Sequence, residues 1–260
     1  MVRLAFDQDG GIVGTKIEAV WLLRRPRAQE NPDVVSPPRS GHHWVECLLG
    51  TLYGLQRVGG SKKPDTAGGL QDGWILHMHR RCAPGFCDAI EAVPAHIVTV
   101  VRDPYDAFVS YYYWTQRRTP GDLERAKSRP RQSMVGKPLD DPEVLAFLAD
   151  PKGFGSLLSR AHEWLHSGRA IAVRYEDLHH EPIAALRRVT EQIAPVEQGR
   201  IEAAIEWCRA ENMRQRSAMM TWNVRAAKVG DSRDRLVEAH LAIFRERYAD
   251  QIRSLGYEVR

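Results

Sequence analysis

The sequence has few cysteines, no long hydrophobic run and nearly balanced charge, and each of these shortages excludes a class of protein. The four cysteines are irregularly spaced and do not indicate the disulfide framework of a small secreted domain. The longest apolar stretches, near 20–23 and 97–101, have the length of strands, whereas a membrane span needs about 20 residues. The N-terminus lacks an apolar signal core, so we expect a soluble, cytoplasmic protein with no membrane span.

The excess of positive charge is also small. Lys and Arg number 37 against 33 for Asp and Glu, which gives a formal net charge of +4. This balance gives no reason to expect a nucleic-acid partner, although it is compatible with small anionic ligands. With 43% hydrophobic residues in 260, the chain is too apolar to be disordered and long enough for one large α/β domain or two small ones.

Apolar residues follow strand-like and helix-like patterns in alternation, which predicts an α/β fold with a central parallel sheet flanked by helices. Residues 1–32 are expected to be an N-terminal extension with a β-hairpin. Residues 33–260 are expected to form one domain with a variable segment at about 116–141. Strands are expected at 33–36, 73–79, 95–101 and 170–175, and helices at 43–55, 105–115, 142–149, 154–166, 177–192, 199–211 and 236–252.

A turn rich in Pro, Arg, Ser and Gly follows the first expected strand. Residues 36–44 read SPPRSGHHW and lead into a helix. Such a turn directs backbone N–H groups and the positive end of the helix dipole toward one point, which suits a phosphate group. Arg39 adds a permanent positive charge. The turn lacks the residue order of a Walker A loop, and an ordinary strand-to-helix turn is the alternative at this point.

Four segments resemble, in order, motifs of the PAPS-dependent sulfotransferases (PAPS is 3′-phosphoadenosine 5′-phosphosulfate). The turn resembles that family's Pro-Lys/Arg-Ser-Gly-Thr-Thr-Trp loop. Residues 100–112, VVRDPYDAFVSYY, resemble its Val-Arg-Asn/Asp-Pro-x-Asp-x-x-x-Ser-x-Tyr motif, and 174–178, RYEDL, its Tyr-Glu-Asp-Leu motif. Residues 224–232, VRAAKVGDS, are a weaker match to Arg-Lys-Gly-x-x-Gly-Asp-Trp. Four matches in order, each on a suitable element, make the resemblance specific.

The resemblance implies a P-loop-containing nucleotide hydrolase-like sulfotransferase fold that binds PAPS, releases 3′,5′-ADP and needs no metal. The turn would hold the 5′-phosphosulfate, while Arg102, Ser110 and Arg225 would hold the 3′-phosphate. Tyr175 would lie near the adenine, and Trp44 would supply a second stacking face. The cofactor-binding residues expected in this way are Arg39, Ser40, Gly41, His42, His43, Trp44, Arg102, Ser110, Tyr175, Arg225 and Gly230.

Each segment also has a purely structural interpretation. Arg102 would form a salt bridge with Asp106, Trp44 and Tyr175 would pack in the core, and 224–232 would be a basic solvated loop.

The chain also departs from the family pattern at two places. His42 and His43 replace two threonines, so two hydroxyl donors are lost, although an imidazole can also donate to phosphate. The lysine expected after Arg225 is missing, and Lys228 could take its place.

Sulfuryl transfer needs a cation at the leaving phosphate and a base for the proton of the acceptor. By resemblance, Arg39 is the cation and His79 is the base, with His77 on the same side of the strand as a helper. Glu46 is the second choice of base, because carbohydrate-type relatives use a glutamate from the loop helix. The alternatives are a structural histidine or an irregularly spaced zinc set. That set would be His77, His79, Cys82 and Cys87.

We therefore expect a sulfotransferase that moves the sulfuryl group of PAPS, by in-line displacement, to a hydroxyl or amine of a small-molecule, carbohydrate or lipid acceptor. The acceptor pocket is expected beside His79, walled by 111–114 and 116–141. An atypical P-loop small-molecule kinase and a non-catalytic nucleotide-binding protein are the alternative functions. The sequence predicts neither the identity of the acceptor nor the oligomeric state.

Overall fold

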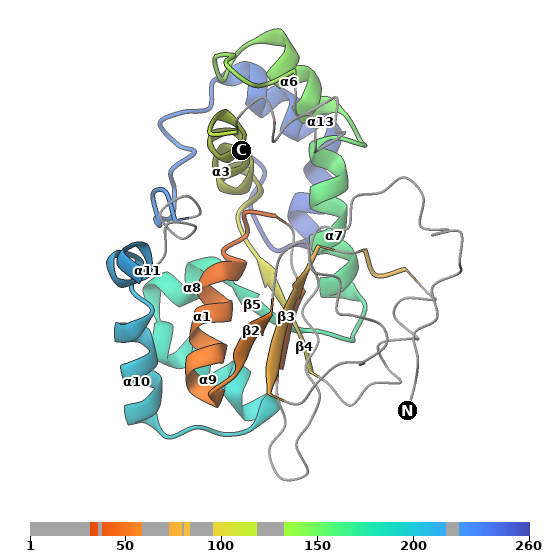
Figure 1. Cartoon of the computed structure of the whole chain (residues 1–260). Helices are drawn as coiled ribbons and strands as arrows, with labels where there is room; N and C mark the ends of the chain where they lie inside the picture. Colours follow the sequence, from red (N-terminus) through yellow and green to blue (C-terminus); the bar gives the residue numbers. More distant parts are fainter. Residues whose placement is uncertain are drawn as a thin grey trace, which may run out of the picture. The chain divides into compact units, whose positions relative to one another are not determined.

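The chain forms two compact units (Figure 1). Unit 1 comprises Met1–Val101 and Glu163–Cys208, and unit 2 comprises Arg102–His162 and Arg209–Arg260. Residues 1–31, which contain the expected hairpin, lie outside the described residues, Pro32 belongs to β1, and the predicted domain limits stay a prediction. The computed structural model describes residues 32–35, 38–58, 73–79, 81–83, 96–118, 133–216 and 224–260.

Unit 1 is built on a parallel five-stranded sheet with the strand order β2-β3-β1-β4-β5. Val34 of β1 lies opposite His77 of β3 and Val98 of β4, and Val101 of β4 lies opposite Arg174 of β5. The central parallel sheet expected from the sequence is confirmed. Because parallel strands end at the same edge, the residues that follow β1, β3 and β5 come together there. The strands are β1 (Pro32–Val35), β2 (Gln56–Val58), β3 (Trp74–Met78), β4 (His96–Val101) and β5 (Ile171–Arg174).

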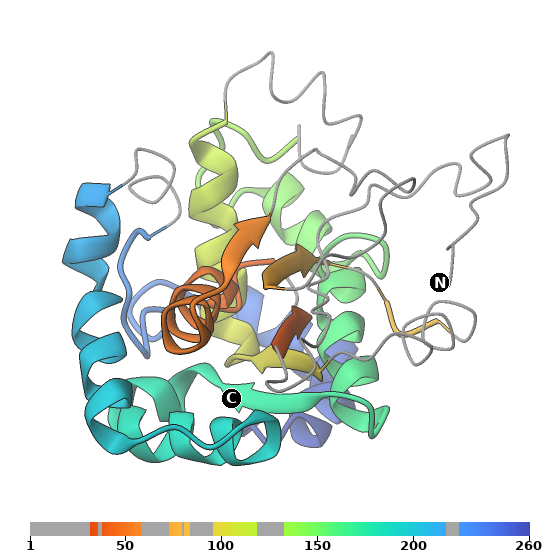
Figure 2. The ribbon, with the colours of Figure 1, turned by 60° about the horizontal axis from the view of Figure 1, so that its bottom comes forward.

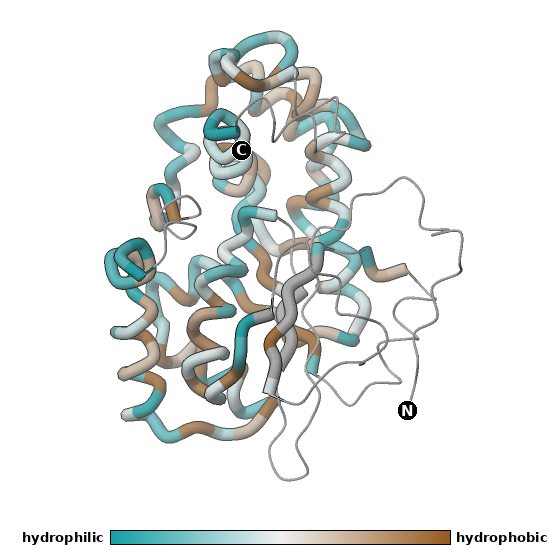
Figure 3. Tube along the Cα trace, viewed as in Figure 1, coloured by the Kyte–Doolittle hydropathy of each residue, from teal (hydrophilic) through white to brown (hydrophobic). Residues whose placement is uncertain are grey.

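Helices of unit 1 pack directly on this sheet. They are α1 (His42–Tyr53), α8 (Tyr175–His180), α9 (Pro182–Ile193) and α10 (Gln198–Trp207). Helix α1 contacts β1 and β2, and α8 and α9 contact β5, with which they form the cyan group in Figure 2. Helix α9 has a buried face formed by Leu186, Val189 and Ile193. Figure 3 shows hydrophobic and hydrophilic residues alternating along the helices, as expected for helices with one buried face.

Unit 2 is helical in the part of the chain that the structure describes. Its helices are α3 (Pro104–Gln116), α6 (Pro142–Ala149), α11 (Ala210–Arg216), α13 (Glu238–Ser254) and α7 (Phe154–His166), which continues into unit 1 after His162. The Phe154 ring packs against Phe108, at 5.3 Å between ring centroids, and against Phe244, at 5.7 Å. Among the described helices of the whole chain, none is both long enough and apolar enough to span a membrane.

Two helices expected from the sequence are each divided in two. The segment 177–192 lies in α8 and α9, because Pro182 has no N–H to donate inside a helix and Glu181 leaves the helical conformation at φ −135°. The segment 199–211 lies in α10 and α11, which are separated at Cys208. Strand β2 was not predicted, because three residues are too few to carry an alternating pattern.

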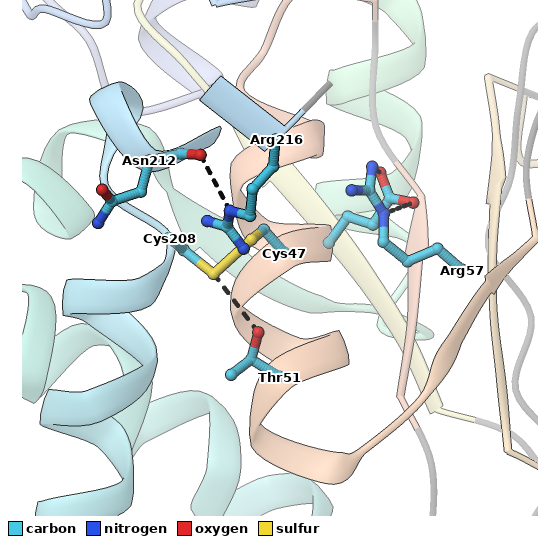
Figure 4. The surroundings of a disulfide bond; sticks show 7 residues. Cys47, Thr51, Arg57, Cys208, Asn212 and Arg216 are labelled. Carbon is cyan, nitrogen blue, oxygen red and sulfur yellow. Dashed lines mark hydrogen bonds and ion pairs between the residues drawn. A yellow bond between two sulfur atoms is a disulfide. The ribbon is translucent and has the colours of Figure 1, made fainter. Parts of the chain in front are cut away.

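Cys47 and Cys208 form a disulfide that the cysteine spacing did not predict (Figure 4). The two residues are 161 positions apart in the sequence, but their Cα atoms are 5.9 Å apart because α1 packs against α10. Cys82 is disulfide-bonded as well, so it is not available as a zinc ligand. The expectation drawn from the cysteines was wrong. Since disulfides persist mainly in oxidising compartments, this one does not support the cytoplasmic location expected from the sequence.

Candidate functional site

The turn between β1 and α1 has a strained backbone. Arg39 has φ 69° and Gly41 has φ 105°, both in the left-handed region that favours glycine. Arg39 and Ser40 are buried, with exposed fractions of 9% and 2%. Within α1, no side chain caps the N-terminus at Gly41 and the first turn has no acidic residue, so the positive end of the helix dipole is not neutralised by the helix itself. Strain of this kind concentrates at ligand-binding turns.

Gly41 lies against the ring of Tyr175, the first residue of α8. A Cβ atom at position 41 would be 2.3 Å from Cδ2 of Tyr175, so only glycine fits without a shift of the ring. The Tyr175 ring packs edge-on against Trp44 at 5.9 Å and against His179 at 4.6 Å between centroids. The fold therefore brings three expected site residues, Gly41, Trp44 and Tyr175, to the carboxyl edge of the sheet.

Three imidazole rings lie together beside the turn. His42 is buried, and its ring centroid is 4.2 Å from that of His43 and 4.9 Å from that of His79, which it meets edge-on. His79 follows β3, the neighbour of β1 in the sheet, which explains why it meets the loop that follows β1. The side chain of His77, the expected helper, lies outside the described part of the chain.

Glu46 of α1 is almost completely buried and is held by Arg57 of β2. The Arg57 guanidinium contacts both carboxylate oxygens, with Nε 2.5 Å from Oε1 and Nη2 2.6 Å from Oε2. Nδ1 of His43 lies 3.1 Å from Oε2 of the same carboxylate. Burial lowers the pKa of His43 below its usual 6.5, and the hydrogen bond to Glu46 limits the decrease. Sequence reasoning missed Arg57, because the strand that carries it was not expected.

In unit 2, Asp106 connects the first turn of α3 to the segment that follows residue 224. Its buried carboxylate accepts hydrogen bonds from the backbone N–H of Gly230 at 2.7 Å and of Ser232 at 2.8 Å. Nη2 of Arg102 lies 4.0 Å from Oδ2 of Asp106 and donates to the carbonyl oxygen of Lys228 at 3.2 Å. The Arg102–Asp106 pair considered from the sequence therefore exists, and the same carboxylate fixes the loop around Gly230.

Asp231 is the centre of a cationic cluster in unit 2. It pairs with Arg225, and with Lys228 and Arg235 at 3.1 Å each. Burial opposes its ionisation, but hydrogen bonds from Arg225, Arg235 and Lys228 outweigh this effect and lower the pKa of Asp231 to about 2. Both arginines also lie over the Tyr113 ring, at 4.5 Å and 4.9 Å. Three cations around one carboxylate leave an excess of positive charge, which suits an anionic ligand.

Part of the expected acceptor wall belongs to the core of unit 2. Tyr111 is buried and stacks on Phe147 at 5.4 Å, and Tyr112 donates a hydrogen bond to the carbonyl oxygen of Lys137. Tyr113 and Trp114 are partly exposed. Of the segment 116–141, the residues 119–132 lie outside the described part. Within the described ranges, no group of three or more His, Cys, Asp and Glu side chains is arranged to hold a metal ion.

Replacing Asp106 by Ala is expected to lower the free energy of unfolding by about 3 kcal/mol. The substitution leaves the N–H groups of Gly230, which is partly exposed, and of Ser232, which is buried, without their charged acceptor, and such bonds contribute about 1.5–3 kcal/mol each. Urea denaturation measures the change. The control is Asp250→Ala in α13, a fully exposed carboxylate, which should change stability by less than about 0.5 kcal/mol. Equal effects of the two substitutions would contradict the role given to Asp106.

The sequence matches the family described as "Sulfotransferase domain" over residues 75–256. The chain therefore belongs to the sulfotransferase family, and the recognition made on the four segments is confirmed. The matched range begins in β3, so the turn at 38–41 lies outside it. No curated protein sequence matches the chain.

Solved structures share the fold. A mouse sulfotransferase, SULT7A1, complexed with PAP, has 15% sequence identity and a TM-score of 0.67, with 89% of this chain and 86% of that chain covered. Retinol dehydratase in complex with androsterone and the inactive cofactor PAP has 12% identity and a TM-score of 0.56, over 88% and 82% of the two chains. Retinol dehydratase with retinol and PAP has 13% identity and a TM-score of 0.54, over 90% and 84%. The α/β sulfotransferase fold expected from the sequence is confirmed.

Proposed function

We propose that this sulfotransferase uses PAPS as donor and transfers its sulfuryl group to a hydroxyl or amine of an acceptor. The observation that carries the proposal is the turn at 38–41, where buried Arg39 and left-handed Gly41 stand at the N-terminus of α1 against Tyr175. At position 41 a Cβ atom would collide with an aromatic ring, and a buried cation lies next to it. This combination suits a site where an anionic nucleotide closely approaches the backbone. All three structural neighbours above contain PAP, which supports the same cofactor here.

Unit 1 would bind the 5′-phosphosulfate through Arg39, Ser40 and the backbone N–H groups of Gly41, His42 and His43. Trp44 and Tyr175 would bind the adenine. PAPS supplies the sulfuryl group, and Arg39 stabilises the negative charge that develops on the leaving phosphate oxygen. The reaction of this class needs no metal ion.

Unit 2 would bind the 3′-phosphate through Arg102, Ser110, Arg225 and Gly230. The excess of cations around Asp231 supports this assignment, because Arg225 belongs to that cluster. Asp106 would keep the backbone of Gly230 in position.

The acceptor is a small molecule, a carbohydrate or a lipid. Small organic molecules are the first class to test, because the structures of retinol dehydratase contain androsterone and retinol.

Thermal unfolding with 3′,5′-ADP, 5′-AMP and ATP–Mg²⁺ tests the cofactor. A ligand at 100 times its Kd adds about 2.7 kcal/mol, which for a chain of this size raises the Tm by roughly 2–4 °C per kcal/mol. A much larger increase with 3′,5′-ADP than with 5′-AMP would support the proposal. An increase with ATP–Mg²⁺ alone would favour the kinase alternative, and no increase with any nucleotide would refute PAPS binding.

Gly41→Ala links this test to the turn. The variant is expected to lose the response to 3′,5′-ADP, because the new Cβ would collide with Tyr175. Gly54→Ala is the matched control. Gly54 ends the same helix with φ 67°, also in the left-handed region, but a Cβ there meets nothing within 4 Å. The control should lose about 1 kcal/mol of stability and keep the full response. If both variants respond like the parent, the turn is not the phosphate site.

A further inference from the structure

His43 is connected through a buried carboxylate to a permanently charged side chain. Oε2 of Glu46 lies 3.1 Å from Nδ1 of His43, and Arg57 donates to both oxygens of the same carboxylate. Glu46 is 2% exposed, whereas the side chains of His43 and Arg57 are 19% and 33% exposed, so a buried carboxylate connects two partly exposed side chains of unit 1. In catalytic triads, likewise, a carboxylate forms a hydrogen bond to one ring nitrogen of a histidine, and the other ring nitrogen accepts a proton.

The hydrogen bonds determine which nitrogen of His43 carries the hydrogen. A carboxylate whose two oxygens pair with two nitrogens of a guanidinium is ionised, and an ionised carboxylate only accepts hydrogen bonds. Nδ1 of His43 is therefore the donor to Glu46. In the neutral ring the lone pair then resides on Nε2. A neutral ring in this tautomer cannot donate from Nε2 to an anion, so its side chain is unsuited to hold the phosphosulfate but suited to accept a proton.

We propose that His43 is the general base of the transfer reaction and that Glu46, fixed by Arg57, is the positioning residue that sets its tautomer. The inference rests on the proposed function, since it takes PAPS as the donor. His43 is the second residue of α1 and follows the turn assigned to the phosphosulfate, so its side chain belongs to the part of unit 1 where transfer would occur. The backbone N–H of His43 can serve the cofactor while the imidazole serves the acceptor.

Sulfuryl transfer forms one bond to sulfur and breaks another, and it moves one proton. The acceptor oxygen forms a bond to sulfur, and the bond between sulfur and the 5′-phosphate oxygen breaks, which leaves 3′,5′-ADP. The proton of the acceptor hydroxyl moves to Nε2 of His43, and the imidazolium formed is stabilised by the carboxylate of Glu46. The proton then passes to water.

Several charged or titratable groups act on His43. Glu46 favours the imidazolium, whereas Arg57 and Arg39 oppose it, and burial opposes it most strongly. The ring of His42 lies 4.2 Å away between centroids. The ring is therefore neutral near pH 7, which is the form that a base requires, and its basicity depends on the charge of Glu46.

The first test measures release of 3′,5′-ADP from PAPS with 2-naphthol, glucosamine and 1-dodecanol as probe acceptors. His43→Gln is expected to lower kcat about 10²–10⁴-fold while keeping the increase in Tm with 3′,5′-ADP. The control His166→Gln replaces an exposed histidine at the end of α7 and should leave kcat unchanged. Loss of both kcat and the Tm response in His43→Gln would overturn the inference, because His43 would then be a cofactor ligand.

The second test concerns Glu46. Glu46→Gln is expected to lower kcat at least about 10-fold and to move the acid limb of the pH profile to lower pH, because the group that stabilises the imidazolium is removed. The matched control is Glu163→Gln, which breaks a pair with the exposed Arg81 in the same unit. It should change neither kcat nor the position of the acid limb. A loss of kcat in Glu46→Gln with an unmoved acid limb would mean that Glu46 is only structural, and this outcome overturns its role.

A third readout does not depend on turnover. The ¹⁵N NMR signals of His43, assigned by their absence in His43→Gln, report its tautomer in the full-length protein. Hydrogen on Nδ1 supports the inference, and hydrogen on Nε2 overturns it.

His79 is the rival base, and His79→Gln completes the set. If His79→Gln loses turnover while His43→Gln stays within about threefold of the parent, the inference falls and the sulfotransferase assignment stands. If the parent protein neither binds 3′,5′-ADP nor releases it from PAPS, the proposed function itself fails. Failure of the inference about His43 would therefore be seen in the variants, whereas failure of the proposed function would be seen in the parent protein.

Discussion

Arg39→Ala is expected to lower kcat for sulfuryl transfer about 10²–10³-fold. Removal of one preorganised group that stabilises charge in the transition state typically has an effect of this size. Arg39 suits the role because it is 91% buried in the turn, where its charge acts in a medium of low dielectric constant. The measurement is steady-state release of 3′,5′-ADP from PAPS, at saturating donor, with the best of the three probe acceptors.

Two further variants separate the charge of Arg39 from its backbone. Arg39→Lys keeps the charge and should retain part of the activity, although it cannot form two parallel hydrogen bonds to a phosphate. Arg39→Gly removes the charge but relaxes the left-handed φ of 69°. If the guanidinium matters, Arg39→Gly is as inactive as Arg39→Ala. Recovery of activity in the glycine variant would show instead that the alanine variant fails through its backbone.

The double variant Cys47→Ala/Cys208→Ala is expected to lose 2–5 kcal/mol of stability, the range usual for removal of a native disulfide. The bond joins residues 161 positions apart, and the chain-entropy account gives the largest stabilisation for long loops, about 5 kcal/mol at this length. At roughly 2–4 °C per kcal/mol, the Tm should fall by about 4–20 °C. Differential scanning calorimetry without reductant measures this change.

Single variants show whether the loss comes from the bond itself. Cys47→Ala and Cys208→Ala should each lose nearly as much stability as the double variant, because either substitution breaks the same bond. Thr51→Ala, whose Oγ1 lies 3.6 Å from Sγ of Cys208, is the control for local packing and should lose about 1 kcal/mol or less (Figure 4). Alkylation of Cys47 or Cys208 in the unreduced parent protein would argue against the bond.

Local sequence signals predicted most elements of the fold. The limits 142–149 and 154–166 agree with α6 and α7, and the expected strand at 95–101 agrees with β4. These segments carry apolar periodicity and clear end signals, such as Pro142 at the start of α6. The division at Pro182 could also have been predicted, because proline both begins one helix and interrupts another.

The contacts that connect the site could not be predicted in the same way. Glu46 and Arg57 meet only because the short strand β2 passes α1, and Asp106 meets Gly230 across 124 positions of sequence. Nothing in the neighbourhood of either carboxylate in the sequence identifies its partner. The family pattern gave the expected site residues, which stay a prediction, but it did not indicate that the carboxylate expected as a second base is held by an arginine and a histidine.

Among the described residues, the parallel sheet ends in two short strands, and their shortness affects how the protein would behave at high concentration. β2 forms one edge with three residues, Gln56–Val58, and β5 forms the other with four, Ile171–Arg174. An edge strand offers unpaired N–H and C=O groups to any other extended chain, and long, flat, apolar edges lead to aggregation. Here each edge offers few such groups, and both carry an arginine. The short edge strands therefore leave little backbone for edge-to-edge association between copies of the protein.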